Sequence, residues 1–128
     1  MIEITANRIN VPEVLDFVRS HTSGGVVHFL GTIRNDNDID GLLYECYPEM
    51  ARKVLETIVA ETKKRWSVEK VSVVHRVGWI PVGEEAVVVA VSSPHRAEAF
   101  EACRFVIDTL KHEAPIWKIE GGKRVACC

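Results

Sequence analysis

Hydrophobic and polar positions follow two periods along the first third of the chain, one typical of strands and one typical of helices. Ile2–Ala6 alternates as a short strand, and a segment that begins at Pro12 carries apolar residues at helical spacing. Val26–Ile33 is predicted to form a buried strand, and the polar run at 35–38 has the composition of an exposed loop. This part therefore predicts a strand, a helix, a strand and a loop.

The middle of the chain predicts a second helix after another strand. Gly41–Tyr47 fits the strand, and Pro48 introduces a helix at 49–66 with one apolar face and one charged face. The apolar face consists of Met50, Val54, Leu55, Ile58 and Val59. Further strands are expected at 70–78 and 84–92, joined by a hairpin-like turn.

A third helix is predicted after Ser93, which we expect to act as its cap. Pro94 fits the first helical position, and Pro115 fits the stop. Its apolar face holds Phe100, Cys103, Ile107 and Leu110, so Cys103 is expected in the core. Residues 116–120 can add a last strand. The predicted fold class is α+β, with antiparallel strands and three main helices.

Composition narrows the classes of function. The length of 128 residues fits one domain over 1–128, and 47% hydrophobic with 27% charged residues is typical of a globular protein. A net charge of -2 gives no overall field to hold nucleic acid. The apolar runs are far shorter than the roughly 20 residues that cross a bilayer, and no secretory signal is recognisable. We therefore expect a cytoplasmic protein that binds neither nucleic acid nor membrane.

The cysteines and glycines do not form any familiar catalytic motif. Cys46, Cys103, Cys127 and Cys128 repeat no zinc or disulfide spacing, and we interpret them as reduced thiols. The sequence also has no phosphate-binding glycine loop and no Gly-x-Ser-x-Gly elbow. We expect no metal and no cofactor.

Candidate chemistry lies at the start of the third predicted helix. His95 and Arg96 follow a strand end, where free backbone N–H groups and the helix dipole favour an anion. An arginine at this end opposes the dipole unless something negative binds nearby. An anion site is therefore favoured over a solvated surface arginine.

Three further cations are candidates, each with an alternative interpretation. Lys111 lies in the last turn of the helix, where it could simply stabilise the dipole. Lys118 lies between apolar residues of a strand, where it could be desolvated for catalysis or could face solvent. Arg34 ends a buried strand, where sites collect, but it could equally solubilise the loop that follows.

The spacing of these residues indicates a dimer if they share one substrate. His95 and Lys111 are sixteen residues apart, which is about 24 Å along a helix. One small pocket cannot span that distance. The simplest arrangement is a homodimer in which each site takes one helix end from each chain.

Five segments carry a resemblance to a known family. They are Phe29–Arg34, Tyr44–Ala51, His75–Gly78, Ser93–Phe100 and Lys111–Glu120. In this order, over about residues 2–120, the chain resembles the large subunit of molybdopterin synthase. The Lys-x-x-x-Pro-x-Trp-Lys-x-Glu ending with an earlier His-Arg is the most specific part. After Glu120 the chain departs from the family, because its ending with Arg124 is short and lacks a tryptophan.

The resemblance implies an α/β hammerhead fold and a sulfurtransferase of molybdenum cofactor biosynthesis. It implies a central homodimer with a small ubiquitin-like sulfur-carrier subunit at each end, giving a heterotetramer. The carrier's thiocarboxylated C-terminal glycine would supply two sulfurs, which convert cyclic pyranopterin monophosphate to molybdopterin. No cysteine nucleophile and no metal is needed in this scheme.

The resemblance also implies roles for individual residues. Arg34, with His95 and Arg96 of the second chain, would hold the phosphate and the pterin. Lys111 and Lys118 would flank the thiocarboxylate, neutralise developing negative charge and move protons. The remaining residues expected to line the pocket are Thr32, Ile33, Ile119 and Glu120.

Two other classes of function remain open at this point. The chain could be a binding module that docks a ubiquitin-like partner or senses a pterin without catalysis, although the pair Lys111 and Lys118 argues against this. It could also be an unrelated phosphate-handling enzyme in which one of these lysines forms a Schiff base.

Overall fold

The structure is a computed structural model that describes residues 1–36, 38–120 and 123–126, with only the backbone at 120, 123, 124 and 126. Cys127 and Cys128, and the side chains of Glu120 and Arg124, therefore lie outside the described part. The described residues form three helices and eight strands. In chain order these are β1 (Ile2–Thr5), α1 (Val11–Val18), β2 (Gly25–Thr32), β3 (Gly41–Cys46), α2 (Pro48–Arg65), β4 (Lys70–Arg76), β5 (Gly78–Pro81), β6 (Glu85–Ser93), α3 (Arg96–Glu113), β7 (Ile116–Glu120) and β8 (Lys123–Ala126).

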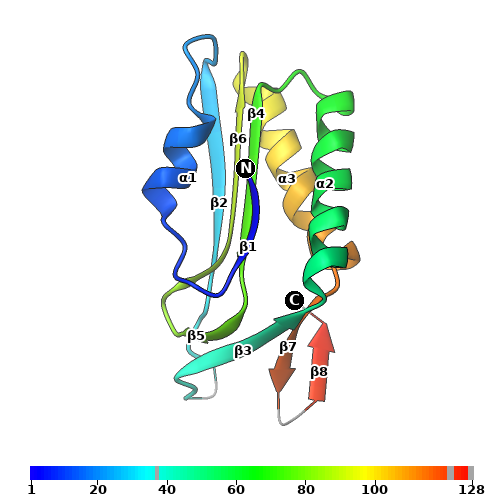
Figure 1. The fold of residues 1–128 in the computed structure, drawn as a ribbon. Coiled ribbons are helices and arrows are strands. Elements are labelled where there is room, and N and C mark those ends of the chain that lie inside the picture. Colours follow the sequence, from blue (N-terminus) through cyan, green and yellow to red (C-terminus); the bar gives the residue numbers. More distant parts are fainter. Residues whose placement is uncertain (37, 121–122, 127–128) are drawn as a thin grey trace.

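The strands make two four-stranded sheets (Figure 1). Sheet A has the order β1-β4-β6-β2, and sheet B, with the order β5-β3-β7-β8, lies across one end of it. The predicted α+β class with three helices is confirmed. The expectation of antiparallel strands holds for every pair except β1 and β4, which are parallel. Two helices separate those strands along the chain, which leaves room for the crossover that a parallel pair requires.

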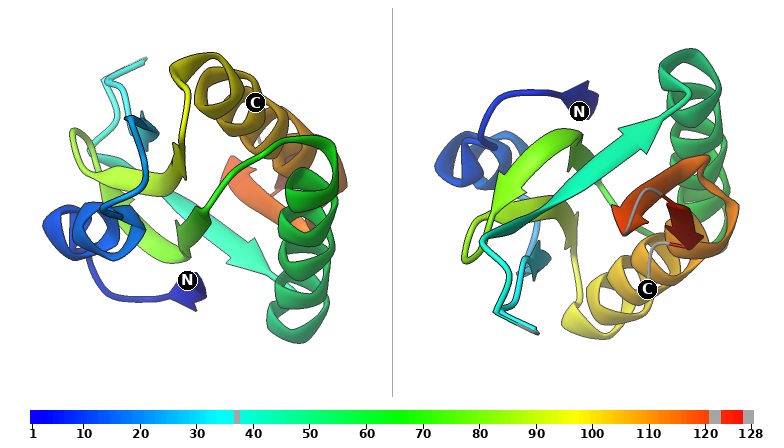
Figure 2. Two further views of the ribbon diagram at one scale, coloured as in Figure 1. Left: turned by 90° about the horizontal axis from the view of Figure 1, so that it is seen from above. Right: turned by 90° about the horizontal axis from the view of Figure 1, so that it is seen from below.

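The helices cover both faces of sheet A, with α1 on one face and the pair α2 and α3 on the other (Figures 1 and 2). Alternate residues of a strand point to opposite faces, so both faces of the central strands must be apolar. Val73 and Val89 pack toward α2 and α3, whereas Val74 and Val88 pack toward α1. This explains the nearly continuous valine runs of β4 and β6.

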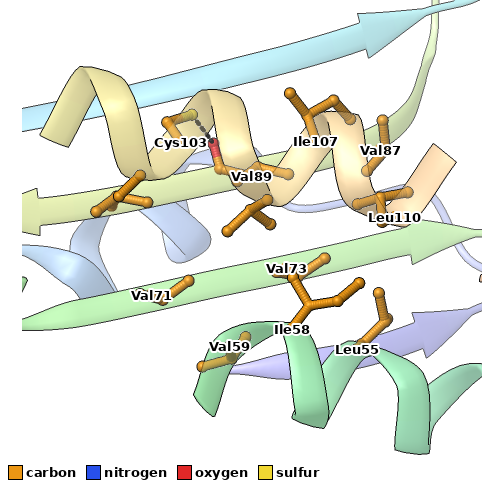
Figure 3. Close-up of a cluster of buried hydrophobic side chains, with 13 residues drawn as sticks. Leu55, Ile58, Val59, Val71, Val73, Val87, Val89, Cys103, Ile107 and Leu110 are labelled. Atoms are coloured by element: carbon orange, nitrogen blue, oxygen red, sulfur yellow. Dashed lines mark hydrogen bonds between the residues drawn. The ribbon is translucent and has the colours of Figure 1, made fainter. Parts of the chain in front are cut away.

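The largest hydrophobic cluster fills the space between sheet A and the two long helices (Figure 3). Leu55 of α2 and Leu110 of α3 face Val73 of β4 in this cluster. Cys103 is buried as expected, and its thiol donates a weak hydrogen bond to the carbonyl of Val89 over 3.9 Å. A smaller cluster that includes Ile33 and Ile116 joins the end of sheet A to sheet B.

Two helix predictions need correction. Met50 and Phe100 were expected on the apolar faces but are 58% and 60% exposed, so neither side chain is buried in the core. The third helix begins at Arg96, with His95 as N-cap and without a side-chain cap. The Ser93 hydroxyl instead donates a hydrogen bond to the carbonyl of His95, so the expected cap at Ser93 was wrong.

The expected turn at 79–83 contains strand β5. Gly78 and Gly83 both have φ of +88°, a conformation that glycine adopts without strain. Between these two points the chain leaves sheet A, pairs antiparallel with β3 in sheet B, and then returns as β6. This excursion brings Trp79 into sheet B.

None of the helices in the described ranges is both long enough and apolar enough to cross a membrane.

Candidate active site

A cavity of about 830 Å³ lies where the end of β2, the following loop, β3 and β7 meet. The register of β2 against β6 shifts between Gly31 and Thr32, and such a bulge turns the end of a strand away from its partner. Lys111, in the last turn of α3, also lines the cavity. Its lining is Phe29–Arg34, Asp36, Ile39, Gly41–Tyr44, Trp79, Lys111, Lys118 and Ile119.

Six of the residues proposed from the sequence line this cavity. They are Thr32, Ile33, Arg34, Lys111, Lys118 and Ile119. The backbone of Glu120 follows directly in β7, but its side chain lies outside the described part. The structure thus collects these residues from β2, α3 and β7, which are distant in the sequence. Their roles in binding or catalysis stay predictions.

Arg34 presents a charged group at the rim of the cavity. Its Nε donates a hydrogen bond to Oδ2 of Asp36 over 2.7 Å, and its side chain is 85% exposed. Exposed ion pairs of this kind are worth about 0–1 kcal/mol, so an anionic ligand can compete for the guanidinium. Ile33 differs, because its side chain is 3% exposed and packs in the cluster beneath the cavity.

Lys111 and Lys118 approach the cavity from two different elements. Lys111 lies in the last turn of α3, and its Nζ is 5.9 Å from the centroid of the Phe29 ring. Lys118 lies opposite Tyr44 in the β3–β7 pair, and directly opposed residues share one face of a sheet. Both lysines are partly buried, so of the two alternatives for Lys118, desolvated or facing solvent, the structure shows an intermediate case.

His75 is buried beside Tyr44 and has the character of a structural residue. Its ring meets the Tyr44 ring edge-on with centroids 5.8 Å apart. Its Nδ1 donates a hydrogen bond to the carbonyl of Arg76 over 2.7 Å, which assigns the proton because a carbonyl only accepts. Burial, with a contribution from the charge of Lys111, lowers the pKa of His75 to about 4. The imidazole is therefore neutral at physiological pH.

His95 and Arg96 do not line this cavity. Both are exposed at the start of α3, and Arg96 lies fifteen residues before Lys111, which is about 22 Å along the helix. The start of α3 lies close against β2, since a Cβ on Gly25 would come within 3.2 Å of the Cα of Arg96. One chain therefore keeps the two proposed halves of the site apart.

A sequence model of the family described as MoaE protein matches residues 4–113 of the chain. The chain belongs to this family. The molybdopterin synthase catalytic subunit of Thermoplasma volcanium is 43% identical over 120 residues, covering 91% of this chain and 88% of that protein. The resemblance to this family, first recognised from the five sequence segments, is confirmed.

Solved structures of the MoaE family share the fold. Molybdopterin synthase from Staphylococcus aureus superposes with a TM-score of 0.87 at 34% identity, covering 98% of this chain and 90% of that chain. A complex of subunits 1 and 2 of molybdopterin-converting factor from Helicobacter pylori contains the same fold, with a TM-score of 0.82 at 23% identity, covering 98% and 89%.

Sequence reasoning missed three aromatic residues of the cavity in this MoaE-family chain. Phe29 and Tyr44 were noted only as parts of family segments, and Trp79 was assigned to a turn. The signal for Trp79 was present, because Trp79 and Ile80 lie between two glycines that can redirect the chain. The indole packs over Gly41, where a Cβ would come within 2.7 Å of its Cζ2.

The described cysteines are poor candidates for sulfur chemistry. Burial raises the pKa of the Cys103 thiol to about 11 and raises the pKa of Cys46 as well. A thiol is a nucleophile only as thiolate, and neither cysteine lines the cavity. Within the described part of the chain, His, Cys, Asp and Glu side chains do not gather in any group of three that could hold a metal.

Proposed function

We propose that the chain is the catalytic subunit of a molybdopterin synthase, a sulfurtransferase of molybdenum cofactor biosynthesis. In this function it transfers two sulfurs from thiocarboxylated carrier subunits to cyclic pyranopterin monophosphate, and molybdopterin is the product. Membership of the MoaE family and the catalytic-subunit names of its relatives support the proposal.

The observation that carries the proposal is the convergence of Lys111, Lys118 and Arg34 on one cavity. Both substrates are anions, one through its phosphate and the other through its thiocarboxylate. Cations that line a partly enclosed cavity stabilise negative charge more strongly than the same cations in water. The aromatic wall formed by Trp79 suits a flat heterocycle such as a pterin.

The chemistry assigned to the lysines follows from their charge. In each transfer a carbon–sulfur bond forms on the pterin substrate and a carbon–oxygen bond to the same carbon breaks. Water hydrolyses the bond between the sulfur and the carrier's acyl carbon, so the carrier is released as a carboxylate. Negative charge develops on sulfur and oxygen during this exchange. Lys111 and Lys118 neutralise that charge as ammonium groups and supply or accept protons as the groups change.

The assembly proposed for this function contains two copies of the chain and two carrier subunits. The carrier is a small ubiquitin-like protein whose C-terminal glycine enters the cavity with its thiocarboxylate. His95 and Arg96 reach the cavity of the second copy and bind the phosphate there. The separation of about 22 Å along α3 supports this arrangement over one site within one chain.

The test is incubation of the protein with a thiocarboxylated carrier and cyclic pyranopterin monophosphate, with mass spectrometry for the two-sulfur product. Lys118→Ala should abolish product while the dimer persists in sedimentation. Lys63→Ala removes an exposed lysine in the last turn of α2, outside the cavity, and should leave turnover unchanged. Near-normal turnover of Lys118→Ala would remove Lys118 from catalysis, and binding of both substrates without product would favour a docking module instead.

A further inference from the structure

Phe29 lies on β2, and its ring faces the ammonium group of Lys111. Lys111 Nζ is 5.9 Å from the ring centroid, within the range of about 6 Å over which an aromatic face attracts a cation. Phe29 is 36% exposed and belongs to none of the hydrophobic clusters that form the core of the described part. Its contribution to core packing is therefore small, and its position needs another explanation.

Gly31 makes room for this position of the ring. Phe29 and Gly31 are two residues apart on a strand, so they lie on the same face. A Cβ on Gly31 would lie 3.2 Å from Cε2 of Phe29 and 2.6 Å from Cγ1 of Val87. The absence of a side chain at residue 31 therefore lets the phenyl ring lie against the strand at the edge of the cavity.

A lysine at a helix end has a flexible side chain, and confining it costs conformational entropy. An aromatic face beside the ammonium favours the conformations in which the charge lies over the cavity. We propose that Phe29 is a positioning residue, whose ring holds the Lys111 ammonium in the place where it acts on the substrates. This inference rests on the proposed sulfur transfer and adds a residue to it that does not itself react.

The chain offers a matched control for this pair. Lys70 Nζ lies 5.4 Å from the centroid of the Phe17 ring, and Phe17 is 42% exposed on α1, away from the cavity. Phe17→Leu and Phe29→Leu thus each remove one cation–π pair from a half-exposed site. Of these two pairs, only Phe29 with Lys111 involves a lysine of the proposed site.

The experiment compares Phe29→Leu, Phe29→Trp and Phe17→Leu in the sulfur-transfer assay. An exposed cation–π pair corresponds to about a two- to fivefold change in rate, so Phe29→Leu should lower kcat by about that factor with little change in KM. Phe29→Trp, with a stronger aromatic face, should keep kcat near the wild-type value. Replacing Phe29 by phenylalanines with increasing ring fluorination keeps the shape and weakens the face, so kcat should fall stepwise along the series.

A second readout needs no substrate and separates this inference from the proposed function. The Cε protons of Lys111 in the wild-type protein should show a ring-current shift in the NMR spectrum, and Phe29→Leu should remove it. If the wild-type protein transfers no sulfur, the presence or absence of this shift still decides whether the pair forms. The inference is overturned if the shift is absent, if Phe29→Leu keeps full kcat, if Phe29→Trp loses as much as Phe29→Leu, or if Phe17→Leu loses as much.

Discussion

The separation of Arg96 and Lys118 predicts that two inactive variants restore each other's activity. Arg96 begins α3, whereas Lys118 lines the cavity with Lys111 at the far end of that helix, about 22 Å away. In the proposed dimer each site combines Arg96 of one chain with Lys118 of the other. A mixed dimer of Arg96→Ala and Lys118→Ala therefore has one intact site and one site that lacks both side chains.

The expected magnitude follows from random pairing of the chains. In an equal mixture half of the dimers are mixed, and each has one intact site out of two, so about a quarter of wild-type activity should return. The two variants are unfolded together, refolded and assayed for the two-sulfur product, beside each variant refolded alone. Coexpression with two different affinity tags isolates the mixed dimer directly, and this form should show about half of wild-type activity.

A mixture of Lys111→Ala with Lys118→Ala provides the control. Both lysines line the same cavity of one chain, so no combination of these two variants contains an intact site. This mixture should therefore stay as inactive as its parts. If the mixture of Arg96→Ala and Lys118→Ala shows only the average of its two components, the shared site is refuted, and each chain must hold a complete site of its own.

Two further predictions concern stability. Leu55→Ala should lower the free energy of unfolding in urea by about 2–5 kcal/mol because Leu55 is fully buried, whereas Met50→Ala on the same helix should change it by less than about 0.5 kcal/mol. Equal losses for both variants would contradict the packing described. Glu69 accepts hydrogen bonds from the hydroxyls of Ser20 (2.6 Å) and Thr22 (2.7 Å), which lower its pKa below the usual 4.5. This pair of bonds should therefore stabilise the fold above pH 4.5 and be lost as pH falls through the folded-state pKa. In calorimetry, the difference in Tm between wild type and Glu69→Gln should be largest near neutral pH and shrink in acid, and a difference that is constant with pH would refute the assignment.

The periodicity of the sequence predicted most of the elements, because strand and helix spacing are local properties. The prediction failed where the exposure of a side chain depends on its contacts with other parts of the chain. Met50 and Phe100 have the correct spacing for an apolar face, but spacing gives only the direction of a side chain. Strand β5 was missed because four residues between glycines look like a turn until their partner, β3, is known.

For the candidate site, too, the sequence predicted individual residues but not the contacts between residues that are distant in the chain. Arg34, Lys111 and Lys118 were recognisable as single residues, and their family segments indicated that they act together. The cavity itself depends on contacts between distant parts of the chain, so the ring of Phe29 beside Lys111 and the indole of Trp79 over Gly41 could not be derived from spacing. Even the structure of one chain leaves His95 and Arg96 outside the cavity.

The order in which the cavity walls occur along the chain has a consequence for synthesis in the cell. The lining residues of β2 and β3 end at Tyr44, but Lys118 and Ile119 belong to β7, which the chain reaches only after α2, sheet A and α3. A ribosome must therefore release every residue through β7 before β7 can pair with β3. Chains that have not yet been synthesised through β7 cannot assemble the proposed site, and any carrier subunit that recognises it would meet only chains that extend beyond this strand.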